Sequence, residues 1–244
     1  MTPDERLALE DVTARAWPAL HTARVGGWRL NASTGHTGRA NTCWALEAPD
    51  RPLDEALAWV DSWYAGFGLP TKFKTVDGAP HPGDVEAFLR AGGFSPDTET
   101  KVMVGPVGGV NDGVLLENAP GELFQGGLFE TLYRDMADAE ERLATLRRIA
   151  QPVRFARIEA DGRAVAVGAV AVDGDWAGVS VMRTSPDFRR QGLAARIVSA
   201  LLDFAAGQGA TRSYLQVEAT NETAVALYEK LGFTTAYQYR YWAR

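Results

Sequence analysis

Apolar residues recur along the chain with two different spacings, and stretches of the two kinds alternate. Apolar residues three or four positions apart lie on one face of a helix. This spacing predicts helices over residues 3–20, 53–68, 85–93, 192–206 and 222–232, and a helical region over 121–150. Short apolar runs with alternation predict strands. These runs are residues 23–33, 38–48, 71–76, 99–107, 114–119, 153–161, 163–173, 175–185, 212–220 and 233–242.

Turn residues connect the strands of the second half of the chain. Asp161-Gly162 and Asp173-Gly174-Asp175 stand between alternating apolar runs. Asp-Gly pairs in this position favour tight hairpin turns. We predict an antiparallel meander that leads into a β-α-β-α-β tail, and an α/β (α+β) fold with a mixed, mostly antiparallel sheet flanked by helices.

The stretch of residues 105–113, "GPVGGVNDG", holds four glycines and a proline and few residues able to pack. Such composition is typical of a domain boundary. On its two sides, "VEAFLRAGGF" and "AVALYEKLGF" share a short helix, a terminal glycine and a phenylalanine, which indicates a repeated module rather than a common helix ending. We predict two modules, residues 1–106 and 113–244.

Composition excludes several classes of function. The formal net charge of −6 and the sequence pI of about 5.2 disfavour a nucleic-acid binder, which needs a basic face. We expect no membrane span, because no run of eighteen apolar residues occurs. Cys43 is alone, which fits a reducing, cytoplasmic compartment. We expect no metal site, because His21, His36 and His81 are scattered without metal-ligand spacing.

Two arginines and a glycine precede the apolar helix that follows residue 192. A helix start leaves about four N–H groups without intrahelical partners, and the helix dipole makes that end partly positive. Gly192 lets an anion approach the backbone, and Arg189 and Arg190 add positive charge beside it. These residues favour a phosphate or pyrophosphate site, with a basic surface loop as the alternative. The pattern is not G-x-G-x-x-G, which disfavours a dinucleotide-binding turn.

The stretches "VMRTSPDFRRQGLAARIVSALLDFA" and "LQVEATNETAVALYEKLGF" resemble the GCN5-related N-acetyltransferase (GNAT) superfamily. Arg189, Gly192 and Ala194 match its R/Q-x-x-G-x-G/A signature. The resemblance implies that this loop wraps the pyrophosphate of acetyl-coenzyme A and that the preceding strand splays from its neighbour to hold the pantetheine arm. The cofactor-binding residues implied are Val181, Met182, Arg183, Arg189, Arg190, Gln191, Gly192, Leu193, Ala194 and Asn221.

Tyr228 matches the tyrosine that in many members of the superfamily protonates the departing thiolate. A phenol suits this task because it keeps its proton at neutral pH. The alternative is a tyrosine that only packs against the sheet. The general base stays open. Gln216 stands where one branch of the superfamily has a glutamate and cannot accept a proton, which leaves Glu218, a relayed water or an acid of the first half.

The first half resembles a degenerate copy of the same module. Pro49 and Pro52 stand at the strand-to-helix junction where the second half has its signature, and Leu89 takes the place of Tyr228. We expect this module to bind no coenzyme A and to wall the acceptor cleft. Five of the seven tryptophans lie in its first 63 residues. These side chains either pack in the interior or form an aromatic cage for a cationic amine.

We therefore predict an N-acetyltransferase that passes an acetyl group from acetyl-coenzyme A to a primary amine by direct attack. The acceptor is a small-molecule or peptide amine, and the residues fix neither its identity nor the oligomeric state. Two other readings stay open: a sensor that binds acyl-coenzyme A without turnover, and a scaffold that uses both modules for partner binding.

Overall fold

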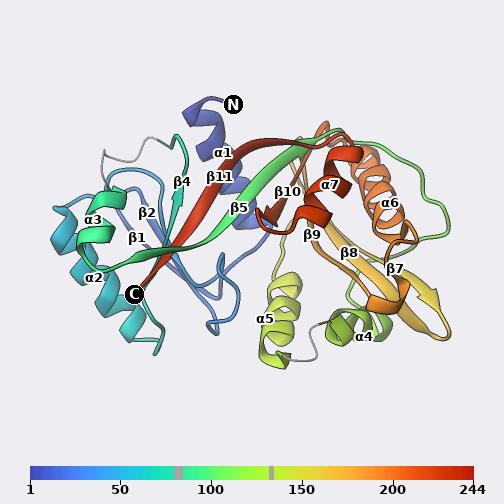
Figure 1. The fold of residues 1–244 in the computed structure, drawn as a ribbon, viewed down its shortest axis with the longest axis horizontal. Helices are drawn as coiled ribbons and strands as arrows, with labels where there is room; N and C mark the ends of the chain where they lie inside the picture. The colour runs from blue at the N-terminus through green and yellow to red at the C-terminus, as the bar shows by residue number, and fades with distance from the viewer. Residues whose placement is uncertain (80–84, 132–134) are drawn as a thin grey trace. The chain divides into compact units, whose positions relative to one another are not determined.

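The computed structural model describes residues 1–79, 85–131 and 135–244, in which helices flank the strands of a mixed sheet (Figure 1). This arrangement confirms the predicted mixed α/β class. The described helices are α1 (Pro3–Arg15), α2 (Leu53–Ala65), α3 (Val85–Ala91), α4 (Glu122–Thr131), α5 (Met136–Arg147), α6 (Leu193–Gly207), α7 (Glu222–Lys230) and the short 3-10 helix η1 (Pro186–Phe188). The strands are β1 (His21–Val25), β2 (Trp28–Ala32), β3 (Cys43–Ala45), β4 (Lys72–Val76), β5 (Ser95–Gly105), β6 (Leu115–Glu117), β7 (Val153–Ala160), β8 (Arg163–Asp173), β9 (Trp176–Thr184), β10 (Arg212–Glu218) and β11 (Thr234–Ala243).

Several elements are shorter than the sequence pattern predicts. The first helix ends at Arg15, before Pro18, because proline cannot continue a helix. The strand predicted over residues 38–48 is reduced to β3, since Asn41 instead accepts hydrogen bonds from the backbone of the preceding loop. The region predicted over 121–150 contains two helices, because the side chain of Asp135 caps a new one. His81 lies outside the described residues.

The chain folds into two compact units, and its end returns to the first of them. Unit 1 comprises Met1–Val102, Glu218–Thr220 and Thr235–Arg244, and unit 2 comprises Met103–Val217 and Asn221–Thr234. The last residues join unit 1 because β11 pairs antiparallel with β4, from Tyr239↔Val76 to Ala243↔Lys72. The sequence predicted residues 113–244 as a single module, whereas this pairing takes the final strand out of it.

Unit 1 has an apolar core on one face of its strands. β1, β2 and β3 are antiparallel, and β3 runs parallel to β4. Alternate residues of these strands point to opposite faces, so that Leu30, Cys43 and Phe73 share one face. The same cluster of buried residues also contains Trp28, Ala56, Val60, Tyr64, Val85, Leu89 and Trp242. This face is therefore a conventional hydrophobic core covered by α2 and α3.

The other face of unit 1 buries charge among aromatic rings. Trp44 is in register with Lys74, and Lys74 with Tyr241. The ammonium of Lys74 lies 3.8 Å from the ring centre of Trp44 and pairs with the carboxylate of Glu10, and both charged side chains are fully buried. Burial lowers the pKa of Lys74 to about 8, against the opposing effect of Glu10. Trp44 thus contacts a cation that belongs to the protein itself.

Unit 2 is built on an antiparallel meander. β6 through β9 pair antiparallel in chain order, and β9 runs parallel to β10. Asp161 and Gly162 both have positive φ, 52° and 73°, as a type I′ turn requires, and Gly174 has φ 59° in the next hairpin. These values confirm the predicted Asp-Gly turns.

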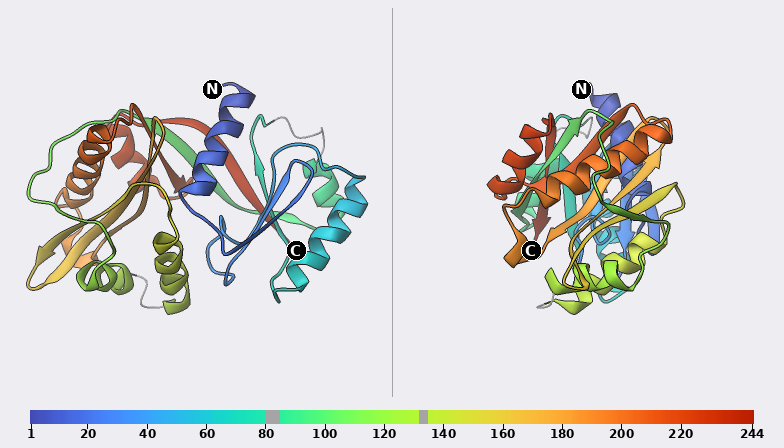
Figure 2. Two further views of the ribbon diagram at one scale, coloured as in Figure 1. Left: turned by 180° about the vertical axis from the view of Figure 1, so that it is seen from behind. Right: turned by 90° about the vertical axis from the view of Figure 1, so that its right-hand side faces the viewer.

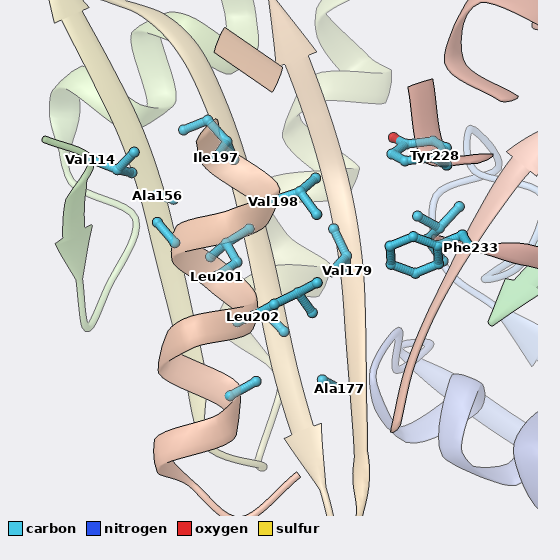
Figure 3. Close-up of a cluster of buried hydrophobic side chains, with 14 of the residues drawn as sticks. Val114, Ala156, Ala177, Val179, Ile197, Val198, Leu201, Leu202, Tyr228 and Phe233 are labelled. Atoms are coloured by element: carbon cyan, nitrogen blue, oxygen red, sulfur yellow. The ribbon is translucent and has the colours of Figure 1, made fainter. Parts of the chain in front are cut away.

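Helices cover both faces of this meander (Figure 2). α6 packs on the face of β8 that Gly168 occupies, and α4 packs on the face of Val167. Figure 3 shows Ile197, Val198 and Leu201 of α6 in one buried cluster with Tyr228 and Phe233. The helices thereby fix the end of β9, where the candidate site lies. No helix in the described part of the chain is long and apolar enough to cross a bilayer.

One local structure occurs in both units. Gly93 and Gly232 follow α3 and α7 with φ of 84° and 87°, values at which glycine avoids the strain of a side chain. The next residue closes the helix in the same way: Phe94 N–H donates to the carbonyl of Leu89 at 2.9 Å, and Phe233 N–H donates to that of Tyr228 at 3.0 Å. Leu89 and Tyr228 therefore hold the same place relative to the two helix ends.

Candidate functional site

β9 and β10 are paired over only part of their length. Their parallel register runs from Trp176↔Arg212 to Val179↔Leu215, and both strands continue beyond it. Backbone N–H and C=O groups need partners when they leave water. Past Val179, the edge of β9 that faces β10 is therefore available to an extended ligand. The splay of this strand was expected from the family resemblance.

A bulge in β9 begins where this pairing ends. Val167 pairs with Arg183 but Ala169 pairs with Ser180, so Val181 and Met182 together oppose the single residue Gly168. Val181 has φ 47°, a left-handed conformation that costs about 1–3 kcal/mol in a β-branched residue. Bulges are frequent next to active sites because they re-aim the backbone. The structure thus brings the predicted residues Val181, Met182 and Arg183 together on a distorted strand edge.

Gly168 leaves the space that the bulge occupies. A Cβ built on it would lie 2.5 Å from Sδ of Met182 and 2.6 Å from Cγ2 of Ile197. We expect Gly168→Ala to lower the free energy of unfolding by about 1–3 kcal/mol, the usual cost of overpacking a core, because Met182 and Ile197 must shift. Urea unfolding measures this effect.

Gly126→Ala is the matched control for this substitution. Gly126 lies inside α4, and a Cβ there would meet no atom within 4 Å. Alanine in an exposed helix interior is favoured over glycine by roughly 0.5–1 kcal/mol. The control variant should be as stable as the parent or more stable. Equal stability of the two variants would contradict the close packing of Gly168 against Met182.

The loop after β9 presents backbone donors and arginines to solvent. η1 is followed by Arg190 and Gly192, both left-handed, with φ of 62° and 77°. Successive N–H groups in such conformations converge and form an anion-binding concavity. Arg189, Arg190 and Gln191 are exposed, whereas Leu193 is buried in the core, so that only its backbone faces the loop.

The helix that follows this loop begins without a negative charge. Gly192 is the N-cap of α6, and the first turn holds no acidic residue. A Cβ on Gly192 would meet nothing within 4 Å, which places open space in front of the helix start. The α6 N-terminus, with Ala194 in its first turn, therefore has the geometry and the charge that favour a bound phosphate.

α7 carries the remaining two predicted residues. Asn221 is exposed and caps this helix, because its Oδ1 accepts from the N–H of Ala224 at 3.2 Å. Tyr228 is 7% exposed and packs edge-on against Phe233. Burial raises the pKa of Tyr228 to about 12, and the positive charge of Arg183 opposes this rise. The structure thus brings Tyr228 of α7 within electrostatic reach of Arg183 on the bulged end of β9.

Residues of β10 and of the hairpin before β9 bear on the choice of a general base. Gln216 and Glu218 sit on the same side of β10, but Glu218 is exposed and belongs to unit 1. Asp175 is a hairpin residue, as predicted, and accepts from Arg212 at 2.9 Å. Within residues 1–79, 85–131 and 135–244, no three His, Cys, Asp or Glu side chains are grouped as metal ligands.

Comparisons with known proteins agree with this geometry. The family model described as "Probable histone acetyltransferase Rv0428c C-terminal" matches residues 3–242. The chain is 30% identical over 243 residues to the probable histone acetyltransferase Rv0428c of Mycobacterium tuberculosis, a match that covers 96% of this chain and 72% of that protein. It is 24% identical over 252 residues to the uncharacterized N-acetyltransferase YobR of Bacillus subtilis, covering 98% of each.

A solved structure shows the same fold over the whole chain. A GCN5-related N-acetyltransferase from Kribbella flavida superposes with a TM-score of 0.69 at 19% identity, covering 100% of this chain and 96% of that one.

Proposed function

We propose a reaction for this chain, which belongs to the family of the probable histone acetyltransferase Rv0428c C-terminal region and is an acetyltransferase of the GNAT family. The reaction moves an acetyl group from acetyl-coenzyme A to a primary amine. The observation that carries the proposal is the bulged end of β9, splayed from β10 and followed by the loop at the start of α6. An extended, anionic thioester fits this combination of an open strand edge and an anion site.

Each part of acetyl-coenzyme A has a proposed contact. The pyrophosphate lies on the backbone N–H groups of residues 190–194, beside the guanidinium groups of Arg189 and Arg190, because the N–H of Arg189 itself donates to the carbonyl of Pro186 at 3.3 Å. The pantetheine amides bond to the backbone of residues 181–183, whose edge toward β10 is not used by the sheet. Asn221 contacts the same arm from the start of α7. The thioester carbon then lies near Tyr228.

Transfer requires a neutral amine, whose lone pair attacks the thioester carbon as the carbon–sulfur bond breaks. The amine proton leaves to water, while Tyr228 gives its phenolic proton to the departing sulfur, so that coenzyme A leaves as a thiol, and the phenolate regains a proton from water. In water a thiol has a pKa of about 8.5, well below that of this phenol, so full proton transfer from Tyr228 would be uphill there. Burial raises the pKa of a bound thiol as well, which narrows the difference between the pKa values of the thiol and of the Tyr228 phenol.

The described residues of unit 1 show none of these features at the start of α2, which supports the proposal that this unit binds no coenzyme A. The first turn of α2 carries Asp54 and Glu55, which would repel a phosphate, and its N-cap is Pro52, which has no N–H. A Cβ on Gly26 would lie 2.3 Å from the backbone nitrogen of Asp50, so the turn at Gly26 already occupies the space beside the segment that precedes α2. In contrast, open space lies in front of Gly192.

An acceptor screen that follows thiol release tests the function. The panel holds polyamines, aminoglycosides, amino acids, peptide N-termini and, because one relative is named a probable histone acetyltransferase, lysine-rich peptides. We expect turnover with at least one primary amine, and acetyl-coenzyme A should raise the melting temperature. Cofactor binding without turnover on any acceptor would favour the sensor, and no thermal shift would favour the scaffold.

Arg189→Ala should raise the KM for acetyl-coenzyme A by about tenfold, because a charge-assisted hydrogen bond to a phosphate contributes roughly 1.5–3 kcal/mol. The value of kcat should change little, since the contact is the same before and during the reaction. Arg51→Ala, which removes an exposed arginine of unit 1 paired with Asp50, is the control. Equal KM values for the two variants would remove Arg189 from the binding site.

A further inference from the structure

Residues 185–192 form the proposed pyrophosphate-binding loop, which we call the phosphate loop. A carboxylate of α4 contacts its first residue. Oε1 of Glu130 accepts a hydrogen bond from Oγ of Ser185 at 3.0 Å. Ser185 is 2% exposed, and its backbone N–H donates to the carbonyl of Val165 at 2.8 Å. Both hydrogen-bond donors of this buried residue are therefore satisfied by neighbours outside the loop, which fixes the point where the loop leaves β9.

An arginine links the same carboxylate to the other end of η1. Arg163, the first residue of β8, forms an ion pair with Oε1 of Glu130. Its guanidinium carbon also lies 5.4 Å from the ring centre of Phe188, which packs against the core. Glu130 and Arg163 thus contact the 3-10 turn at both ends, through Ser185 and through Phe188. The hydrogen bond from Arg163 is the main reason that the pKa of Glu130 is lowered.

A glycine of α4 allows this contact. A Cβ on Gly127 would lie 2.8 Å from Cγ1 of Val167 and 3.0 Å from Cβ of Ala164, so only glycine lets the helix approach β8 this closely. Glu130 lies three residues later in the same helix and therefore on the same side. The close packing of α4 on β8 therefore also brings the carboxylate of Glu130 to Ser185.

We propose that Glu130 and Arg163 form a latch that holds residues 185–192 in the conformation that binds pyrophosphate, and so strengthen acetyl-coenzyme A binding without touching the ligand. The proposal rests on the proposed function. Arg190 holds a left-handed conformation, which is unfavourable for a residue other than glycine and which an unrestrained loop would lose. A loop ordered before binding does not lose conformational entropy when the ligand arrives. Glu130 and Arg163 are therefore positioning residues.

The latch predicts a change in affinity rather than in turnover. The ion-paired side chains of Arg163 and Glu130 are 41% and 35% exposed, so the pair itself adds little to global stability. In Glu130→Ala, we expect the Kd for coenzyme A and the KM for acetyl-coenzyme A to rise about five- to tenfold, with kcat at saturation unchanged. Glu130→Gln should lie between this variant and the parent, because its amide oxygen can still accept from Ser185.

Two further variants make the test specific. Ser185→Ala in the Glu130→Ala background should add little to the loss, because both substitutions remove the same hydrogen bond. Glu140→Ala, which removes an exposed carboxylate of α5, should leave the Kd unchanged. Equal Kd values for parent and Glu130→Ala, or a lower kcat at unchanged KM, would overturn the latch.

Amide hydrogen exchange separates failure of the latch from failure of the proposed function. Without ligand, the amides of residues 185–192 should exchange faster in Glu130→Ala than in the parent, and those of α6 should not. If the parent fails to bind coenzyme A, the proposed function is wrong, and exchange still decides whether Glu130 orders the loop. Unchanged exchange in this loop would reject the latch even if coenzyme A binds.

Discussion

Tyr228→Phe should lower kcat by roughly 10²- to 10⁴-fold, the usual contribution of a positioned proton donor, with the Kd for coenzyme A nearly unchanged. The substitution removes only the hydroxyl. The ring is 7% exposed and packs edge-on against Phe233, so phenylalanine keeps these contacts. Thiol release at saturating acetyl-coenzyme A measures kcat, and titration with coenzyme A measures binding.

The pH dependence of kcat tests the same residue. Because burial raises the pKa of Tyr228 to about 12, the phenol keeps its proton through pH 10, where an ordinary tyrosine is half ionised. The value of kcat should therefore show no decline from about pH 8 to about pH 10.5, after correction for spontaneous thioester hydrolysis. A decline with a midpoint near pH 10 would contradict the buried, protonated donor.

Tyr64→Phe is the matched control for Tyr228→Phe. Tyr64 is also buried, and its hydroxyl donates to the carbonyl of Asn31 at 3.0 Å within unit 1. The same hydroxyl accepts from the N–H of Asn31 at 3.4 Å, so removing it should reduce stability by about 1–3 kcal/mol, as the loss of two hydrogen bonds does, and leave kcat unchanged. If both variants lose activity equally, the effect of Tyr228→Phe is structural and the tyrosine only packs.

Lys74→Met should lower the free energy of unfolding by about 3–5 kcal/mol, the cost of leaving a buried charge without its partner. Glu10 is fully buried, and without Lys74 its carboxylate still accepts the hydrogen bond from Tyr237 at 2.8 Å but loses its ion pair with the described part of the chain. Such a loss is a large share of the stability of an ordinary domain. Urea unfolding followed by tryptophan fluorescence measures it.

A second substitution and a surface control define this result. In the Lys74→Met, Glu10→Gln double variant, most of the loss should be recovered, because no buried charge remains and Tyr237 can still donate to the amide oxygen. Arg212→Met removes the cation of an ion pair whose side chains are 52% and 49% exposed, and should cost less than about 1 kcal/mol. A loss no greater for Lys74→Met than for Arg212→Met would contradict the buried pair.

Local patterns in the sequence were enough to predict much of the fold and to propose the phosphate loop. Asp161-Gly162 predicts its turn because the pair accepts positive φ, and Gly192 before an apolar helix predicts an anion site because helix starts expose N–H groups. The proposed role of Tyr228 as a proton donor came from resemblance to a family. All of these signals lie within short stretches of chain, where neighbouring residues determine the backbone.

Tertiary structure decided the features that depend on distant residues. Lys74 lies between Phe73 and Thr75 in β4, and this pattern does not tell whether water or Glu10 of α1 covers the side chain of Lys74. Val181 takes a left-handed conformation against its own preference, because the bulge fits the space beside Gly168. Glu130 meets Ser185 across 55 positions of sequence. No local pattern encodes such contacts, because they form only when packing brings separate elements together.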